Sequence, residues 1–250
     1  QSALKIADEV LVADSGSTDR TLEIVRSLGP YRIIEREYVN SGDFKNWAIP
    51  QASHPWVMIL DGDERIPDDM ADEIRQLLSK TPDHDGYWVY RTNYFMGHRI
   101  RFSGWRNDKV MRLFRRDEGI YTGGTDHAEV TIRSGRISAL KHRMLHFTYW
   151  DYDQYFAKFQ RYTTYQAHKW HREGKPFSTG KMLFNMPMRF LYNYIFRLGF
   201  LDGVAGLQVC LLTGFYSFMK QDRLWQLQEG KRSSTIDREM ADRSRTRRAA

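Results

Sequence analysis

Three carboxylates directly follow a short apolar run: Asp61, Asp63 and Glu64 come after residues 56–60. A continuous apolar run of this length predicts a strand that is buried on both faces. Carboxylates this close repel one another unless a cation or a polar ligand compensates them, and a divalent metal is a common cation in such clusters. The segment therefore predicts a ligand or metal site at a strand end. The alternative is a solvated acidic turn before a helix at 67–78.

A second strand, residues 9–13, runs directly into a polar segment that begins with Asp14 and Ser15. The small residues that follow allow a tight turn, and Ser17 or Thr18 is expected to cap the next helix. A carboxylate at the carboxyl end of a strand, beside the amino end of a helix, suits a nucleoside with its phosphates nearby. The alternative is a capped turn that binds no ligand.

Strands and helices alternate through the first part of the chain. The predicted elements are strands and helices in turn, at 9–13, 22–28, 32–35, 44–48 and 56–60. This order predicts an α/β fold with a mainly parallel sheet. In such sheets ligands bind beyond the carboxyl ends of the strands, where Asp14 and Asp61 are expected to lie.

These segments resemble the nucleotide-sugar half of glycosyltransferase family 2: DSGSTDRT after one strand, Lys45-Asn46 at a helix, and LDGDE after the next strand. The resemblance implies the Rossmann-like glycosyltransferase-A fold, with a mixed, mostly parallel sheet and helices on both faces. It places Asp14 and Ser15 at the nucleotide, with Asp14 on the base. Family members usually begin with one more strand, so the chain is expected to begin inside a domain whose first strand is missing.

The same resemblance implies roles for the polar residues at the other two segments. Asp61 would bind the ribose or a metal, and Asp63 would hold Mg²⁺ or Mn²⁺ on the sugar diphosphate. Lys45 and Asn46 match a position that helps to hold the nucleotide.

Basic residues follow a predicted strand at 110–114. Arg112 could bind a diphosphate or an anionic acceptor, because a guanidinium matches the spacing of phosphate oxygens. The alternative is an exposed strand face with solvated charges, which is the interpretation favoured for Arg115 and Arg116.

Another polar group, Asp126, His127 and Glu129, precedes a strand at 130–132. It falls where many family members carry a His-Glu pair near the acceptor, although one extra residue intervenes here. An inverting transfer needs a carboxylate to accept the proton of the acceptor hydroxyl, so Asp126 and Glu129 are the candidate bases. His127 could be the base, a phosphate contact or a loop residue. The structural alternative is a turn closed by an Asx hydrogen bond from Asp126.

The region after residue 148 is helical and rich in aromatic residues. An aromatic stripe, expected to pack on the sheet domain, comprises Tyr152, Tyr155, Phe156, Phe159 and Tyr162.

Two apolar segments follow, at 182–200 and 204–219. The second is too short to span the hydrocarbon core of a typical membrane. The mixture of aromatic and apolar residues with basic ones favours helices that lie in the interface of an anionic membrane. The alternative is a helical subdomain that buries this face internally. The GFLDG element at 199–203 resembles family members related to lipopolysaccharide core β-glucosyltransferases.

Composition narrows the remaining possibilities. The 250 residues include one cysteine, Cys210, which excludes a disulfide framework. Lys and Arg exceed Asp and Glu by 38 to 31, and residues 230–250 hold seven of the basic residues against three acidic ones, so the tail is predicted to be disordered. Nucleic-acid binding is not favoured, because the excess charge lies in the tail and no recognised motif occurs.

The sequence therefore predicts a domain at 1–148, a helical subdomain at 149–229 and a basic tail. We expect an inverting, metal-dependent glycosyltransferase that uses a nucleotide sugar, such as a UDP-hexose, on a lipopolysaccharide core or another lipid-linked glycan. It would lie in the cytoplasm, on the inner face of the bacterial cytoplasmic membrane. The alternative is a non-catalytic nucleotide- or lipid-binding module of the same fold.

Overall fold

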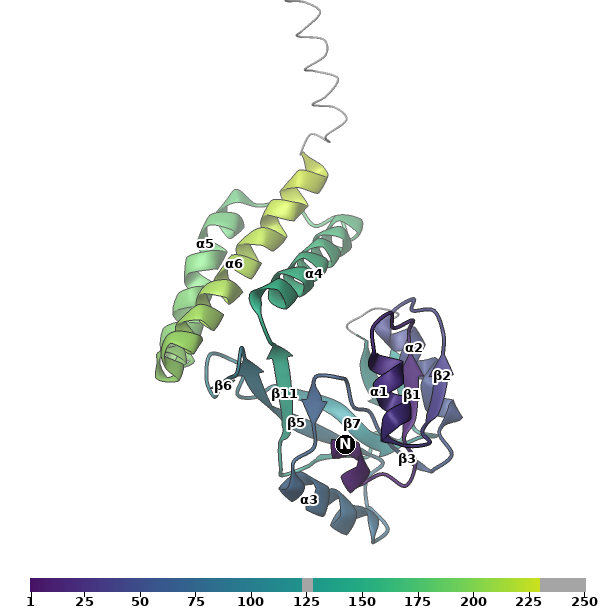
Figure 1. Ribbon diagram of the computed structural model, residues 1–250. Helices are drawn as coiled ribbons and strands as arrows, with labels where there is room; N and C mark the ends of the chain where they lie inside the picture. Colours follow the sequence, from purple (N-terminus) through teal and green to yellow (C-terminus); the bar gives the residue numbers. More distant parts are fainter. Residues whose placement is uncertain (123–127, 230–250) are drawn as a thin grey trace, which may run out of the picture. The chain divides into compact units, whose positions relative to one another are not determined.

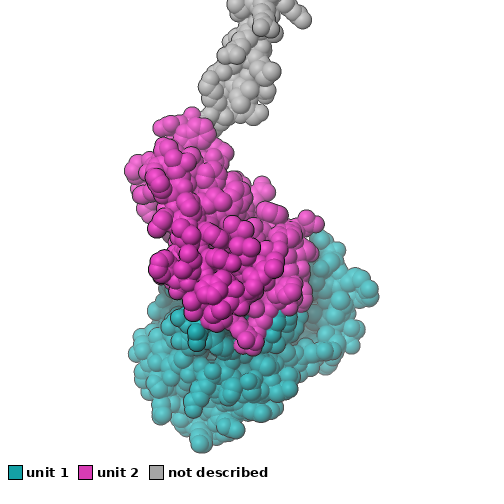
Figure 2. Space-filling model, turned by 90° about the vertical axis from the view of Figure 1, so that its left-hand side faces the viewer, with its two compact units in different colours: residues 1–94, 105–148 teal, residues 95–104, 149–250 magenta. Residues whose placement is uncertain are grey.

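The computed structural model describes residues 1–122 and 128–229. The chain forms two compact units, shown in different colours in Figure 2. Unit 1 comprises residues 1–94 and 105–148, and unit 2 comprises residues 95–104 together with the segment from 149 onward. Residues 95–104, which the sequence analysis assigned to the first domain, thus belong with the carboxyl-terminal helices. The predicted tail, 230–250, lies outside the described residues.

The amino-terminal part of unit 1 is a small βαβ unit. Its elements, with the helices that follow it, are η1 (Ser2–Lys5), β1 (Leu11–Asp14), α1 (Thr21–Leu28), β2 (Arg32–Glu35), α2 (Ser41–Ala48) and η2 (Ile49–Gln51). Strands β1 and β2 pair in parallel, from Leu11 opposite Arg32 to Asp14 opposite Glu35. The strand predicted at 32–35 is confirmed, and the first strand begins two residues later than predicted.

The predicted cap of the first helix is wrong. Helix α1 begins at Thr21 rather than directly after Thr18, and its N-cap residue, Arg20, makes no side-chain capping hydrogen bond. The Ser17 hydroxyl instead donates to the carboxylate of Asp14, so it is not available to a helix end. Asp19 accepts a hydrogen bond from the amide of Thr21 (2.9 Å). The Ser17 hydroxyl therefore closes the turn after β1, and the helix begins only at Thr21.

The larger sheet of the chain is mixed. Its seven strands and the helix between them are β3 (Trp56–Met58), β4 (Glu64–Arg65), α3 (Asp68–Leu78), β5 (Gly86–Phe95), β6 (His98–Ile100), β7 (Lys109–Arg115), β10 (Ile137–Ala139) and β11 (Met144–Tyr149). The order is β3-β7-β5-β11-β4. Pairing is antiparallel for β3 with β7, β5 with β7 and β11 with β4, and parallel for β10 with β5. Strands β8 (Gly119–Thr122) and β9 (Glu129–Ile132) form a separate antiparallel pair.

The apolar run that leads to the three carboxylates has both faces covered, as the sequence predicted. Trp56, Met58 and Leu60 pack against the core cluster that includes α3. Val57 and Ile59 belong to a second cluster on the opposite face. Only the first three residues of the run pair as a strand, yet alternate residues enter two cores. This run is therefore held rigidly where it meets the acidic turn.

Unit 2 is largely helical. Its elements are β6 (His98–Ile100), α4 (Tyr152–Arg172), α5 (Thr179–Leu191), η3 (Tyr192–Phe196), η4 (Gly199–Asp202) and α6 (Gly203–Gln228). Helices α5 and α6 lie side by side, and α4 packs on α6 (Figure 1). A Cβ atom at Gly214 of α6 would come within 2.9 Å of the carbonyl oxygen of Met186, so the small residue permits the close approach of α5.

The aromatic stripe on α4 packs on two sets of aromatic side chains. Its buried members are Tyr155 and Phe159. Tyr155 contacts Phe95 of β5 and Tyr149 of β11, at centroid distances of 6.3 and 4.9 Å, so this part of the stripe packs on strands of the sheet as predicted. Phe159 stacks on Phe215 of α6 at a centroid distance of 5.4 Å. Among the described residues, the helical stretch at 199–228 is long and apolar enough to cross a membrane by length and composition, and one third (33%) of its apolar window is buried.

Candidate functional site

The acidic turn after β3 is closed on itself. The amide of Glu64 donates to the carbonyl of Asp61 (3.0 Å), and the amide of Asp61 donates to Oε2 of Glu64 (3.0 Å). The side chain of Glu64 is fully buried, whereas that of Asp61 is 40% exposed. Glu64 thus shapes the turn from inside, and Asp61 faces the accessible side.

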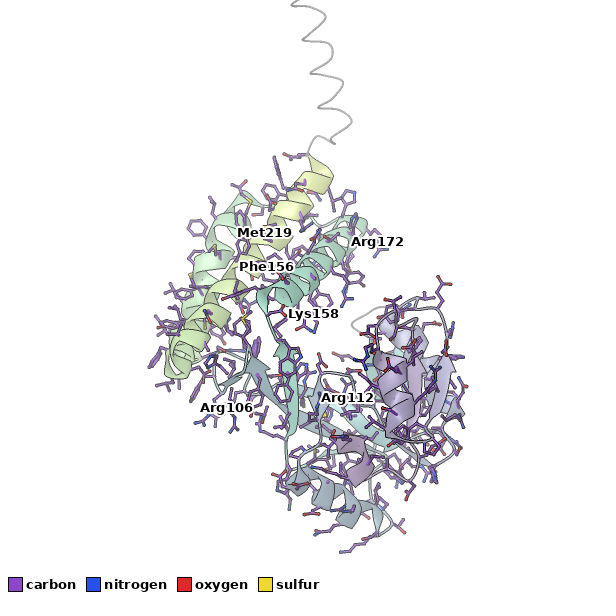
Figure 3. The ribbon with its side chains drawn as sticks, in the orientation of Figure 1. Arg106, Arg112, Phe156, Lys158, Arg172 and Met219 are labelled. Carbon is purple, nitrogen blue, oxygen red and sulfur yellow. The ribbon has the colours of Figure 1, made fainter. Side chains whose placement is uncertain are left out.

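Two cations meet the carboxylate of Asp61. Arg112 lies in unit 1 (Figure 3). From β7 it donates through Nη2 both to Asp61 and to Oε1 of Glu64, the latter at 2.7 Å. Lys45, from α2, places Nζ 3.1 Å from Oδ1 of Asp61. Burial opposes the charge of Asp61, but the ion pairs with Arg112 and Lys45 hold its pKa below the ordinary value. Burial also opposes the charge of Arg112, yet Glu64 and Asp61 raise its pKa. Both shifts favour the charged forms of Asp61 and Arg112.

Helix α2 is fixed to β8 by Asn46. Its side-chain amide donates to the carbonyl of Tyr121 (2.8 Å) and accepts from the amide of Tyr121 (2.9 Å). The neighbouring Lys45 holds Nζ 5.4 Å from the centroid of the Tyr121 ring. Burial lowers the pKa of Lys45 and raises that of Tyr121 to about 12. Asn46 therefore positions Lys45 over Asp61, while Tyr121 provides one wall of the site.

Asp63 faces a second network, which begins at His146 of β11. His146 Nε2 lies 3.7 Å from Oδ2 of Asp63, and its Nδ1 lies 2.6 Å from Oδ1 of Asn93. Asn93 donates through Nδ2 to Oδ2 of Asp108 (2.9 Å). Asp108 also accepts two hydrogen bonds from Arg91, each 2.9 Å.

This network fixes the tautomer of His146. Burial raises the pKa of Asp108, but the hydrogen bonds and charge of Arg91 outweigh it and keep the pKa low. Because an ionised carboxylate only accepts, the NH₂ group of Asn93 must face Asp108, and its oxygen must face His146. Nδ1 of His146 is then the donor, and in the neutral ring Nε2 directs a lone pair toward Asp63.

The pair formed by Asp63 and His146 fits a divalent cation. Their separation of 3.7 Å exceeds a hydrogen bond. Two ligands bound to one cation at about 2.1 Å lie roughly 3.0–3.6 Å apart, so little movement is needed. A metal-ligating histidine also typically donates its other ring nitrogen to a fixed acceptor, as His146 does to Asn93. In the part of the chain that the structure describes, no group of three or more His, Cys, Asp or Glu residues could hold a metal. Further ligands would have to come from water or from the phosphates of a substrate.

Asp14 ends β1 with its carboxylate turned into the following loop. It is 6% exposed and accepts hydrogen bonds from the amides of Gly16 and Ser17, both 2.8 Å, as well as from the Ser17 hydroxyl. These hydrogen bonds from Ser17 lower the pKa of Asp14. Ser15 is exposed beside it. Asp14 therefore organises the loop, and its role on a nucleotide base stays a prediction.

The candidate bases fall at the start of β9. Asp126 and His127 lie outside the described residues. Glu129 is exposed and pairs across the hairpin with Thr122, next to Tyr121. The hairpin that carries Glu129 thus shares Tyr121 with the site around Lys45.

The structure brings Lys45, Asn46, Asp61 and Arg112 together, as the sequence analysis grouped them. It shows Asp63 facing His146, and a shared metal between Asp61 and Asp63 stays a prediction. Sequence reasoning gave no functional role to Tyr121, His146, Arg91, Asn93 and Asp108. One signal was available for His146: it alternates with Thr148 on a strand, and two polar residues at a spacing of two mark one face. Arg115 and Arg116, which were predicted to carry solvated charges on an exposed strand face, are partly buried and donate to Asp117 and to the carbonyl of Ala52.

Known proteins are similar to this chain over most of its length. Residues 1–147 match the family model described as Glycosyl transferase family 2. The lipopolysaccharide core biosynthesis glycosyltransferase LpsC of Rhizobium meliloti (strain 1021) is 27% identical over 241 residues, which cover 94% of this chain and 89% of LpsC. An uncharacterized glycosyltransferase of Rickettsia typhi (strain ATCC VR-144 / Wilmington) is 26% identical, over 90% of this chain and 80% of that protein. The crystal structure of S. aureus TarS 1-349 in complex with UDP-GlcNAc aligns with 14% identity and a TM-score of 0.40, over 92% of this chain and 87% of that one.

The family match over residues 1–147 and the glycosyltransferase relatives define this mixed α/β chain as a glycosyltransferase that uses a nucleotide sugar. The chain belongs to glycosyl transferase family 2.

Proposed function

We propose that the protein transfers a hexose, with inversion, from a UDP-sugar to a hydroxyl group of a lipopolysaccharide core or another lipid-linked glycan. The observation that carries the proposal is the pair of adjoining networks on one turn, with cations on Asp61 and an imidazole facing Asp63. The name of the Rhizobium relative supports the acceptor class. A lipid-linked acceptor in turn supports a place in the cytoplasm, at the inner face of the cytoplasmic membrane.

In this proposal Asp63 and His146 hold Mg²⁺ or Mn²⁺, and Asp61 contributes to the metal or to the ribose. A cation held there would supply positive charge that stabilises the leaving diphosphate. Lys45 lies beside the carboxylate of Asp61 and adds positive charge on the accessible side of the turn. Arg112 is 5% exposed, so we assign it to orienting Asp61 rather than to contacting the diphosphate directly.

The chemical step is one displacement. A carboxylate, Asp126 or Glu129, accepts the proton of the acceptor hydroxyl, with His127 as a further candidate. The hydroxyl oxygen forms a bond to the anomeric carbon while the bond from that carbon to the diphosphate oxygen breaks. UDP leaves with the electron pair of that bond, and the anomeric configuration inverts.

The test is the thermal midpoint of the full chain with and without UDP, in Mn²⁺ and in chelator. Ligands that bind only the native state raise the thermal midpoint by mass action. At a hundredfold excess of ligand over Kd, the free energy of unfolding rises by about 2.7 kcal/mol. We expect a rise that needs both UDP and Mn²⁺, and its loss in Asp63→Asn. Asp117→Asn, at an exposed surface ion pair, is the matched control.

Release of UDP from a panel of nucleotide sugars then separates the two functional alternatives. Turnover of a UDP-hexose that requires Glu129 or Asp126 supports the transferase mechanism. Metal-dependent binding of UDP without turnover on any lipid-linked glycan would favour a non-catalytic binding module. A thermal midpoint that UDP leaves unchanged under every condition would refute the nucleotide site.

A further inference from the structure

Helix α5 carries an exposed apolar stripe, here called the outer stripe. It comprises Phe184, Met188, Leu191 and, in η3, Ile195, at steps of four, three and four residues. Their exposed fractions are 67%, 62%, 40% and 49%. Because this spacing keeps residues on one side of a helix, the four side chains form a continuous line along it.

The opposite side of α5 is the one that packs within the protein. A Cβ at Gly214 of α6 would meet Met186 and Phe190, and Asn193 is buried next to Gly199. A surface helix normally places polar residues opposite its packed side, whereas a helix that is apolar on both sides is normally buried on both. The outer stripe is thus an apolar face that the described part of unit 2 leaves uncovered.

The outer stripe continues around the end of the helical pair. The turn that joins α5 to α6 adds further exposed apolar side chains: Phe196, Leu198, Phe200, Leu201 and Val204. Phe196 and Val204 are 75% and 73% exposed. Of the 23 large apolar side chains exposed among the described residues, 12 lie between 183 and 211. Such a concentration marks an interaction surface rather than scattered exposure.

The charge around this surface is positive. Lys181, Arg189 and Arg197 are exposed on the same segment. The nearest acid in sequence, Asp202, uses its carboxylate to accept from the amides of Arg101 and Phe102, at 2.8 to 3.1 Å. The exposed rim of the apolar surface is therefore cationic.

This pattern selects a lipid surface over a second copy of the chain. Two copies joined through the same surface would bring Arg189 and Arg197 near their equivalents, without exposed acids to pair with them. The phosphates of an anionic bilayer supply the missing negative charge, and its acyl region covers the apolar side chains.

We propose that unit 2 docks in the plane of an anionic membrane through the outer stripe and the turn that follows it. The side chains of Phe184, Met188 and Phe196 enter the boundary between headgroups and acyl chains, and the arginines bind lipid phosphates. The proposal names the membrane partner of the proposed lipid-linked reaction. It depends on unit 2 alone and not on the nucleotide site of unit 1.

The experiment is flotation of the full chain with vesicles of phosphatidylcholine, with and without phosphatidylglycerol. We expect the native chain to bind the anionic vesicles. The double variant Phe184→Gln with Met188→Gln should bind them at least about tenfold more weakly, because both changes remove apolar area that docking would bury. Ile120→Gln with Ile137→Gln, two exposed apolar side chains of unit 1, should bind as the native chain does. Arg189→Gln should reduce the preference for anionic lipid.

A labelled cysteine reports the depth of insertion. Cys210 is fully buried, so a polarity-sensitive dye attached to Phe196→Cys reports from the apolar surface. Its emission should shift to the blue on anionic vesicles, and the same dye on Ile137→Cys should not shift.

Three results would overturn the proposal: equal binding by the double variant of the outer stripe, equal binding to neutral vesicles, or dimers in solution that the double variant abolishes without any vesicle binding. The UDP- and Mn²⁺-dependent rise in thermal midpoint should persist in the same double variant. Failure of docking is thereby distinguished from failure of the proposed reaction.

Discussion

Replacing Glu64 by Gln tests whether a buried carboxylate holds the site together. Oε1 of Glu64 accepts from Arg112 (2.7 Å) and from Arg91 (3.4 Å), and Oε2 accepts from the amide of Asp61 (3.0 Å). Gln keeps the shape but turns one oxygen into an NH₂ group. Whichever way the amide points, a donor then faces a donor, and the two guanidinium groups lose their shared buried anion.

The size of the effect follows from these contacts. Removing one partner of a buried ion pair costs about 3–5 kcal/mol, because the remaining charge stays buried. A domain has a free energy of unfolding of only about 5–15 kcal/mol, so the loss is a large fraction of it. For a unit of this size we expect the thermal midpoint to fall by roughly 10 °C or more.

Urea unfolding followed by tryptophan fluorescence and by circular dichroism measures the change. Glu23→Gln is the control, because Glu23 pairs with Arg20 at the exposed surface and its loss should leave the midpoint unchanged. A double-mutant cycle with Arg112→Gln should return a coupling of about 1–3 kcal/mol. A loss below about 1 kcal/mol in Glu64→Gln, with no coupling to Arg112, would refute the reasoning.

Two further predictions concern the residues beside this turn. Asn93→Ala should weaken Mn²⁺ binding in the full chain about 10–100-fold, because it removes the acceptor that orients His146; Mn²⁺ titration by electron paramagnetic resonance measures it, and unchanged affinity would exclude His146 as a ligand. Asp14→Asn should flatten the acid side of the stability profile. Hydrogen bonds from Ser17 lower the pKa of Asp14, so its contribution is present above the unfolded value near 4 and is lost as pH falls through the lower folded value. Urea unfolding between neutral pH and about pH 2 checks this prediction, which fails if the two proteins lose stability in parallel.

The sequence predicted the part of the site that local order determines. An apolar run followed by acids places Asp61 and Asp63 at a strand end, and the alternation of elements brings Lys45 and Asn46 of α2 to the same place. The strand at 32–35 and the two-sided packing of the run at 56–60 follow from the same reasoning, since composition and short-range periodicity decide them.

The rest depends on pairing between distant segments. His146 reaches Asp63 because β11 pairs with β4 in a register that places His146 opposite Glu64. Such a register is set by turns and packing far from either residue, so the local sequence pattern does not predict it. The wrong helix cap has a different cause. A serine near a helix can form a hydrogen bond either to the helix end or to a neighbouring carboxylate, and its position in the sequence does not determine which of the two it forms.

The charges of the site explain why metal and nucleotide should bind together. Three cations and three anions are joined by ion pairs around the buried turn: Lys45, Arg91, Arg112, Asp61, Glu64 and Asp108. This set pairs equal numbers of cations and anions, and Asp63, which faces His146, adds one further carboxylate beside it. One carboxylate and one imidazole nitrogen are a weak site for Mg²⁺ or Mn²⁺, which normally also takes phosphate oxygens. A diphosphate in turn gains little from a network of paired charges unless the cation is present. Each ligand should therefore raise the affinity for the other by the same factor, as linkage requires, and independent binding of the two would contradict this account of the site.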